Sequence, residues 1–350
     1  MALVFAHETL GQRVLFGTAQ AAVHLSDEVR RLKAGSVMLI AAADEMAMAA
    51  DVASGIDVAI PYSDVAPHVP MENAVRAREV AAAAGVDLLV CVGGGSTTGL
   101  AKVIALASGI PIVAIPTTYA GSEATNVWGM TEASRKTTGV DNAVLPVTVI
   151  YDAALTLSLP VEISVASGLN AIAHCVDSMW APKADPINAA MATEGIRALS
   201  RALPVVRSDP RDLAGREQAL YGAYLSAVAF ASAGSGLHHK ICHVLGGAYN
   251  LPHAQTHATV LPHVLGFNAE GAPEAAERIA SAFGSTSAVQ GLNELRSRLA
   301  VPRALRNLGL AEDSIDEAVE LILPMVPESN PRAVTRENLA QLLRAAWAGS

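Results

Sequence analysis

Histidines are the residues of this sequence best suited to chemistry. Seven of the ten lie between positions 174 and 263, and these are His174, His238, His239, His243, His253, His257 and His263. Asn170 and His174 are four residues apart, as are His239 and His243, so on helices each pair projects from one face. Converging imidazoles either bind a transition metal, usually completed by a carboxylate, or carry out polar chemistry themselves.

A single histidine and the set of histidines are best interpreted in different ways. His257 or His263 alone is most simply a hydrogen-bonded core residue. His174, His239, His243 and His253 together indicate a shared function, either metal binding or direct polar chemistry. Asn170 stands where a fourth ligand is expected, and because an uncharged amide binds divalent cations weakly, metal affinity should be low.

A glycine-rich turn is the second chemical feature. The apolar run VDLLVCV is typical of a strand buried on both faces, and Gly93, Gly94, Gly95 and Ser96 follow it directly before a helical stretch. Such a turn lets the backbone approach a ligand, and the helix start offers free N–H groups to a pyrophosphate. The spacing excludes a nucleophile elbow, a Walker loop and G-x-G-x-x-G. A phosphate cradle and a structural strand-to-helix corner remain.

A second loop favours the phosphate cradle. The stretch IPIVAIPTTYAGSEAT is another buried strand that runs into Thr117, Thr118, Tyr119 and Ser122. Neighbouring parallel strands end at the same edge of a sheet, so two such loops indicate one shared dinucleotide site.

The elements that position these residues change in character along the chain. Short β-rich runs alternate with Ala-rich helical segments over the first 150 residues. They predict strands at 13–16, 36–41, 57–60, 86–92, 110–115 and 147–151, a helix at 71–85, and a mostly parallel sheet. Beyond Asp152 the apolar spacing becomes helical. We therefore expect an α/β domain at 1–155 and an all-α domain at 156–350.

Composition limits the classes of partner. The 350 residues carry a net charge of −9 and 51% hydrophobic residues, which argues against nucleic-acid binding. Long apolar stretches and a leader-like N-terminus are absent, so neither export nor membrane insertion is expected. Three scattered cysteines without a C-x-x-C pair favour a reduced, cytoplasmic protein.

Several ordered motifs resemble the iron-containing alcohol dehydrogenase superfamily, and within it the maleylacetate reductases. They are GGGSTTGLAK, AIPTTYAGSEAT with VWG, GLNAIAHCVDS, HHKICHVLGGAYNLPHAQTHATVLPHV and NPRAVTRENL, which span nearly the whole chain. Two residues depart from the alcohol dehydrogenase pattern: Gly99 and Asn170 each replace an Asp. Both departures favour the maleylacetate reductases.

The resemblance implies a fold and a cofactor. It implies a Rossmann-like N-terminal domain and a helical C-terminal domain in the dehydroquinate synthase-like arrangement, with the active site in the cleft between them, and a homodimer. The implied cofactor is NADH or NADPH. Its pyrophosphate is expected at Gly93, Gly94, Gly95 and Ser96, its nicotinamide near Thr117, Thr118 and Ser122, and a ribose or phosphate at Lys136. Asp44 is the candidate for a ribose-binding acid.

The resemblance also implies a reaction, the reduction of the conjugated C=C bond of maleylacetate to 3-oxoadipate during the breakdown of aromatic compounds. His243 is expected nearest the nicotinamide, with His174, His239 and His253 around it. Asn170, Tyr119, Trp128 and Lys240 are the expected substrate residues, with Arg332 a further carboxylate partner.

The sequence also leads to expectations about a bound metal and about alternative functions. A metal, if bound, would occupy the positions of Asn170, His174, His239 and His253, but we expect turnover without one. The alternatives are a metal-dependent alcohol dehydrogenase, a dehydroquinate-synthase-like lyase and a non-catalytic nucleotide-binding module.

Overall fold

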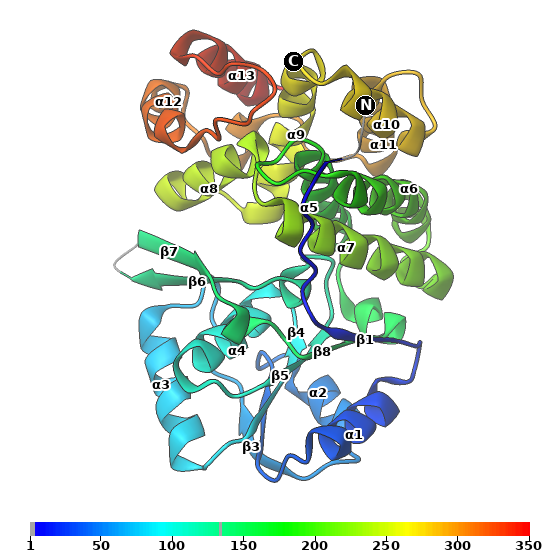
Figure 1. The fold of residues 1–350 in the computed structure, drawn as a ribbon, viewed down its shortest axis with the longest axis vertical. Coiled ribbons are helices and arrows are strands. Elements are labelled where there is room, and N and C mark those ends of the chain that lie inside the picture. Colours follow the sequence, from blue (N-terminus) through cyan, green and yellow to red (C-terminus); the bar gives the residue numbers. More distant parts are fainter. Residues whose placement is uncertain (1–3, 133–134) are drawn as a thin grey trace. The chain divides into compact units, whose positions relative to one another are not determined.

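A computed structural model describes residues 4–132 and 135–350 (Figure 1). The chain divides into an α/β unit, Leu10–Leu159, and a helical unit, which comprises Met1–Thr9 and Pro160–Ser350. The expected division between residues 155 and 156 differs from this by four positions, and it placed the N-terminal residues in the other domain. These residues bind the helical unit through His7 Nδ1, 2.8 Å from Asp185 Oδ2, and through the carbonyl of Glu8, which accepts from Ser232 Oγ.

The α/β unit contains a six-stranded parallel sheet, in the order β1-β8-β5-β4-β2-β3. The strands are β1 (Arg13–Phe16), β2 (Val37–Ile40), β3 (Val58–Tyr62), β4 (Leu88–Gly93), β5 (Ile112–Pro116) and β8 (Thr148–Tyr151). All six expected strands are present, and the prediction of a parallel sheet is confirmed. Every residue of β2, β4, β5 and β8 is buried, as near-continuous apolar runs predict.

Helices cover both faces of this sheet. They are α1 (Ala21–Leu32), α2 (Met46–Val52), α3 (Met71–Ala83) and α4 (Gly95–Ser108). Because successive side chains of a strand point to opposite faces, Val90 of β4 packs with the core of α1 and α2, and Leu89 with that of α3 and α4.

A two-stranded antiparallel hairpin, β6 (Val127–Glu132) and β7 (Arg135–Val140), was not predicted. Its sequence is largely polar and lacks the apolar run that marks the other strands. Trp128 pairs with Gly139, and a Cβ on Gly139 would lie 2.6 Å from the indole, so the pair depends on a glycine. Short 3-10 helices flank the hairpin and β8: η1 (Ser122–Ala124), η2 (Asn142–Val144) and η3 (Ala153–Ser158).

The helical unit is built around α5 (Val161–Ser178), which is buried from Ser164 to Ser178. The other α-helices are α6 (Pro186–Ser208), α7 (Leu213–Ala233), α8 (Leu237–Tyr249), α9 (His253–Ala269), α10 (Pro273–Phe283), α11 (Ala288–Leu299), α12 (Ile315–Ile322) and α13 (Arg336–Ala348). Three 3-10 helices are η4 (Leu305–Leu308), η5 (Glu312–Ser314) and η6 (Leu323–Met325). The prediction of an all-helical second half is confirmed. In the residues described, no helix has the length and apolar character needed to span a membrane.

Candidate active site

The glycine turn joins β4 to α4 and leaves little room for side chains. Gly93 has a φ of 150°, and a Cβ there would lie 2.6 Å from Thr97 Oγ1. A Cβ on Gly94 would lie 3.0 Å from Thr118 Cγ2, but one on Gly95 would meet nothing nearer than 3.8 Å. No side chain caps the N-terminus of α4. Its N–H groups are therefore available to an anion, as a phosphate cradle requires.

The loop after β5 lies against this turn. Gly93 pairs with Pro116, and the Thr117 N–H donates to the Gly93 carbonyl at 3.2 Å. Thr118 and Ser122 are partly exposed, whereas Tyr119 is completely buried, which does not suit the expected contact with substrate. The side chain of Lys136 falls outside the described part of the chain.

An acidic residue at the end of β2 reaches the same edge of the sheet, but it is not the expected one. Asp44 is exposed, while Glu45 accepts a hydrogen bond from Thr117 Oγ1 at 2.8 Å. Burial raises the pKa of Glu45. The sequence placed an acid in this loop but could not fix its register.

Lys102 of α4 stabilises the second loop. Its ammonium donates to the carbonyls of Ser122, Thr125 and Val127 at 2.6, 2.8 and 2.8 Å, and to Thr125 Oγ1 at 3.0 Å. The side chain is fully buried, and burial lowers its pKa to about 7. Sequence analysis did not single out Lys102, so this role was missed.

In the helical unit, six histidines from α5, α8 and α9 form one histidine cluster of His174, His238, His239, His243, His253 and His257. The rings of His174 and His239 stack with centroids 4.9 Å apart and an interplanar angle of 18°. His243 and His253 are exposed, and the other four are buried. No ring contact in the described residues joins His263 to the cluster.

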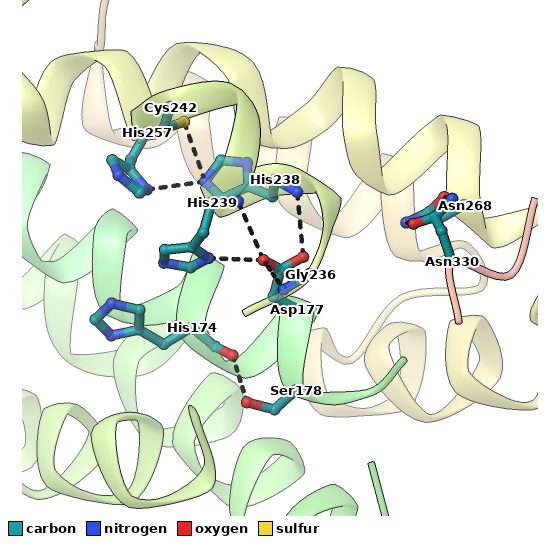
Figure 2. A network of polar contacts seen from close by, with 10 residues as sticks. All are labelled: His174, Asp177, Ser178, Gly236, His238, His239, Cys242, His257, Asn268 and Asn330. Atoms are coloured by element: carbon teal, nitrogen blue, oxygen red, sulfur yellow. Dashed lines mark hydrogen bonds and ion pairs between the residues drawn. The ribbon is translucent and has the colours of Figure 1, made fainter. Parts of the chain in front are cut away.

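Asp177 binds the start of α8 and one ring of the cluster (Figure 2). Its carboxylate accepts from the backbone N–H groups of Gly236 and His239 at 3.0 and 3.1 Å, where α8 begins. It also lies 2.7 Å from His239 Nδ1. This bond places a proton on Nδ1 of His239 and leaves a lone pair on Nε2. Sequence analysis missed Asp177, although an acid three residues after His174 on one helix was a usable signal.

Burial keeps the imidazoles of the four buried histidines of the cluster uncharged. It lowers the pKa of His174, His239 and His257 well below the usual value, and that of His238 to about 3. The same burial raises the pKa of Asp177, against the hydrogen bonds that its oxygens accept. The buried rings therefore act as neutral groups near pH 7.

Several buried polar atoms of the cluster region have no hydrogen-bond partner in the protein. They are Asn170 Oδ1, His174 Nδ1, His239 Nε2, His257 Nε2 and His238 Nδ1. Buried polar atoms are nearly always paired, so such a concentration indicates a place for a polar ligand.

The remaining expected substrate residues lie on separate elements. Lys240 lies on α8, partly exposed, and Trp128 lies on β6. Arg332 forms an ion pair with Glu270 at 2.8 Å and covers the ring of Phe267. It therefore already has a carboxylate partner.

The residues at the expected metal positions do not form a closed metal site. Asn170 brings no charge to this set, so three neutral imidazoles and one amide would have to hold a cation there. In the described parts of the chain, the His, Cys, Asp and Glu side chains that bring three ligand atoms within 4.8 Å are His238, Cys242 and His257. All three side chains are buried, and two of their ligand atoms, His238 Nε2 and His257 Nδ1, already form a hydrogen bond.

Gly99 has a packing role that the sequence did not show. A Cβ on this residue of α4 would lie 2.9 Å from Val69 Cγ2. The glycine at this position therefore has a steric reason in this chain. Of the two departures from the alcohol dehydrogenase pattern, Asn170 is then the more informative about function.

Comparison with known proteins gives the same family over both units. The family models "Iron-containing alcohol dehydrogenase" and "Fe-containing alcohol dehydrogenase family, C-terminal" match residues 11–153 and 164–347. The maleylacetate reductase of Pseudomonas sp. (strain P51) is 44% identical, over 99% of this chain and 98% of its own.

Solved structures agree in fold. An iron-containing alcohol dehydrogenase from Corynebacterium glutamicum is 61% identical with a TM-score of 0.98, over 99% of this chain and 98% of its own. The maleylacetate reductase from Agrobacterium tumefaciens is 41% identical with a TM-score of 0.95, over 100% and 99%. The α/β sheet, the helical half and the full-length matches lead to one conclusion: the chain belongs to the iron-containing alcohol dehydrogenase family.

Proposed function

We propose that this protein reduces the conjugated C=C bond of maleylacetate with NADH or NADPH and releases 3-oxoadipate. The observation that carries the proposal is identity of 42–44% to maleylacetate reductases along almost the entire chain. The site supports it, because the histidine cluster is completed by the amide of Asn170 and offers unpaired polar atoms. The substrate, a dicarboxylate with a ketone next to the alkene, has oxygens that can accept from the donors among them.

The reaction requires one hydride and one proton. A bound nicotinamide would supply the hydride to the alkene carbon next to the carboxylate, and the electron pair of the double bond would then move to the ketone oxygen as an enolate. A proton then adds to the alkene carbon next to the ketone. An enzyme accelerates these steps by stabilising the enolate oxygen and by supplying the proton.

We assign the cluster residues to these steps as follows. His243 and His253 are exposed side chains that a substrate can reach, and His243 is our candidate for the proton donor. Asp177 holds His239 in the tautomer that offers Nε2 as an acceptor. Asn170 and His174 supply further unpaired polar atoms, Oδ1 and Nδ1, and His174 Nδ1 can donate to a substrate carboxylate or ketone when it carries the proton.

For the cofactor, we propose that Gly93 to Ser96 cradle the pyrophosphate and that Thr117, Thr118 and Ser122 line the nicotinamide side. Gly95→Ala tests the cradle sharply, because the added Cβ meets only ordinary contacts at 3.8 Å. We expect unchanged thermal stability and an increase of about tenfold in the Kd for NADH, since a methyl group would displace a closely approaching phosphate. Unchanged NADH affinity would show that no ligand approaches Gly95.

We further propose that turnover needs no bound metal. A divalent cation in this family would polarise a substrate oxygen, but here Asn170 removes the charged ligand that holds it. Elemental analysis and activity after exhaustive chelation test this: stoichiometric metal lost together with activity would overturn it. Asn170→Asp should raise zinc or iron retention and lower maleylacetate reduction.

The competing activity is alcohol oxidation, since one relative at 61% identity is called an iron-containing alcohol dehydrogenase. We expect NADH consumption with maleylacetate and no NADH formation from ethanol or propanediol with NAD, with or without added zinc or iron. Oxidation of either alcohol without reduction of maleylacetate would favour the competing activity. A lyase of the dehydroquinate synthase type would convert its substrate without net consumption of NADH.

We also propose a cytoplasmic homodimer. The three cysteines, Cys91, Cys175 and Cys242, are buried and unpaired, which supports a reducing compartment. The dimer rests on the family resemblance, and sedimentation equilibrium of the purified protein tests it.

A further inference from the structure

We propose that His257 is a further catalytic residue, which donates a hydrogen bond from Nε2 to the oxyanion formed on the substrate, and that His238 positions its ring. This inference rests on the proposed function. The residues expected from the sequence to do chemistry did not include His257, which was taken for a core histidine.

His257 lies inside the histidine cluster. Its side chain, near the start of α9, is fully buried. Its ring centroid is 4.4 Å from that of His253 and 4.9 Å from that of His239. In Figure 2 the rings of His257, His239 and His174 lie one beneath another on the same side of Asp177. His257 is therefore in direct contact with two histidines of the expected reacting set.

The hydrogen bonds of His257 are incomplete in a way that a core histidine rarely shows. His238 Nε2 and His257 Nδ1 are 2.9 Å apart, so one proton lies between the two rings. Neither His238 Nδ1 nor His257 Nε2 has a partner in the protein. An unpaired buried polar atom lowers the stability of the folded state, and here the pair carries two. A ligand that bonds to one of them would remove part of this cost.

The second ring proton of the His238–His257 pair has two alternative positions. With both rings neutral, it sits on His238 Nδ1 or on His257 Nε2. The first leaves a donor on His238, whose aromatic contacts in the described residues are with His239 and His257 and whose Nε2 also lies 3.6 Å from Cys242 Sγ. The second leaves a donor on His257, beside the exposed His253 that a substrate can reach. We assign the proton to His257 Nε2, with His238 Nε2 donating to His257 Nδ1.

The reaction needs such a donor, and His239 does not provide it. Neutral His239 carries one proton, on Nδ1, and donates it in the hydrogen bond to Asp177. The Nε2 atom of His239 can therefore only accept a hydrogen bond. A developing enolate oxygen requires donors placed before the reaction begins. His257 is a neutral side chain whose partner leaves Nε2 carrying the proton, and so it fits this role.

Two substitutions separate the roles of the two nitrogens. The amide of Asn occupies roughly the place of Nδ1, and the longer Gln places its amide near Nε2. We expect His257→Asn, which retains the partner of His238 but loses the donor, to lower kcat by about 10²-fold or more. His257→Gln should lose no more than about tenfold, because an amide N–H remains at the Nε2 position. A simple structural pair predicts the reverse order, and that result would overturn the inference.

Control measurements identify the cause of any loss. NADH affinity of both variants should stay within about twofold of wild type, since the loss belongs to the chemical step. His238→Gln, with an amide near Nε2, should retain most of the activity, and His238→Asn should not. If a substitution at either position unfolds the chain, nitrogen NMR of the wild-type histidines decides: a proton on Nδ1 of His257 contradicts the assignment.

The proposed function and this inference fail in different ways. Wild-type protein that does not reduce maleylacetate rejects the proposed function. Active wild-type protein together with a fully active His257→Asn rejects the role of His257 alone.

Discussion

The two units differ in how completely their buried polar groups are hydrogen-bonded. In the described residues, nine buried side-chain nitrogen or oxygen atoms have no hydrogen-bond partner, and eight of them lie in the helical unit. The exception is His24 Nε2. In the α/β unit, by contrast, the buried Lys102 makes four hydrogen bonds, and the buried Glu123 accepts from Tyr151 at 2.8 Å.

Complete and incomplete hydrogen bonding suit different tasks in an enzyme. Complete hydrogen bonding fixes a loop in one conformation, which suits a site that grips a cofactor the same way in every turnover. Unpaired polar atoms cost stability, and they persist where a ligand completes them. We infer that the α/β unit preorganises the loops around the glycine turn and that the helical unit supplies the reacting groups.

Asp177→Asn should produce the largest effect on this comparison. The amide cannot accept all the hydrogen bonds of the carboxylate, and it releases the His239 tautomer. We expect kcat to fall by about 10³-fold or more, since a wrong tautomer can cost about 10⁴. Ser178→Ala is the matched control: it removes only the bond from Ser178 Oγ to the His174 carbonyl, at 2.7 Å, and should change kcat by less than about tenfold. Equal losses in the two variants would remove the special role of Asp177.

Gly93→Ala should break the cofactor side. A Cβ there would lie 2.6 Å from Thr97 Oγ1 and 2.8 Å from Glu45 Oε2, at a φ that disfavours side chains. We expect the Kd for NADH, measured by fluorescence titration, to rise by about 10²-fold, with a lower melting temperature. An Ala variant that binds NADH like wild type would show that the turn is not the cradle.

Lys102→Met should have a smaller effect, on binding more than on chemistry. It leaves the carbonyls of Ser122, Thr125 and Val127 without their donor, so the free energy of unfolding should fall by about 3 kcal/mol. We expect the Kd for NADH to rise by about tenfold while kcat at saturating NADH stays within about threefold. Lys183→Met, at an exposed lysine, controls for loss of charge. A large fall in kcat with unchanged Kd would contradict the positioning role.

Acid should change the stability of the folded state and leave the catalytic step the least affected. Burial, together with the nearby charge of Arg296, lowers the pKa of His263 from 6.5 to about 4. The unfolded chain therefore binds a proton first as pH falls from 6.5 towards 4, and the folded state loses up to about 1.4 kcal/mol per pH unit for this group. Urea denaturation at several pH values should show a shallower slope in His263→Gln. An unchanged slope would mean that His263 does not contribute.

The sequence predicted the parts whose residue patterns are local. Continuous apolar runs predicted all six strands of the parallel sheet, but the polar hairpin that carries Trp128 has no such run. Spacing predicted that Asn170 and His174 share a helix, and that His239 and His243 do. It could not show that the N-terminus of α8 meets Asp177, because that contact joins residues about 60 positions apart in the chain.

Within the histidines, sequence spacing also could not show which partner each ring has. His238 and His239 are adjacent, yet one bonds to His257 and the other to Asp177. His263 shares the same stretch of sequence but not the ring contacts of the histidine cluster. Packing between helices decides these partners, and one sequence carries no direct record of it.

The most direct test of the account follows the hydride. Maleylacetate is incubated with chelator-treated protein and NADH that carries deuterium at the transferable position, and the product is analysed by NMR. The account predicts 3-oxoadipate with its ketone intact and deuterium on the carbon next to a carboxylate. Deuterium on a carbinol carbon, or transfer only after a metal is restored, would contradict it.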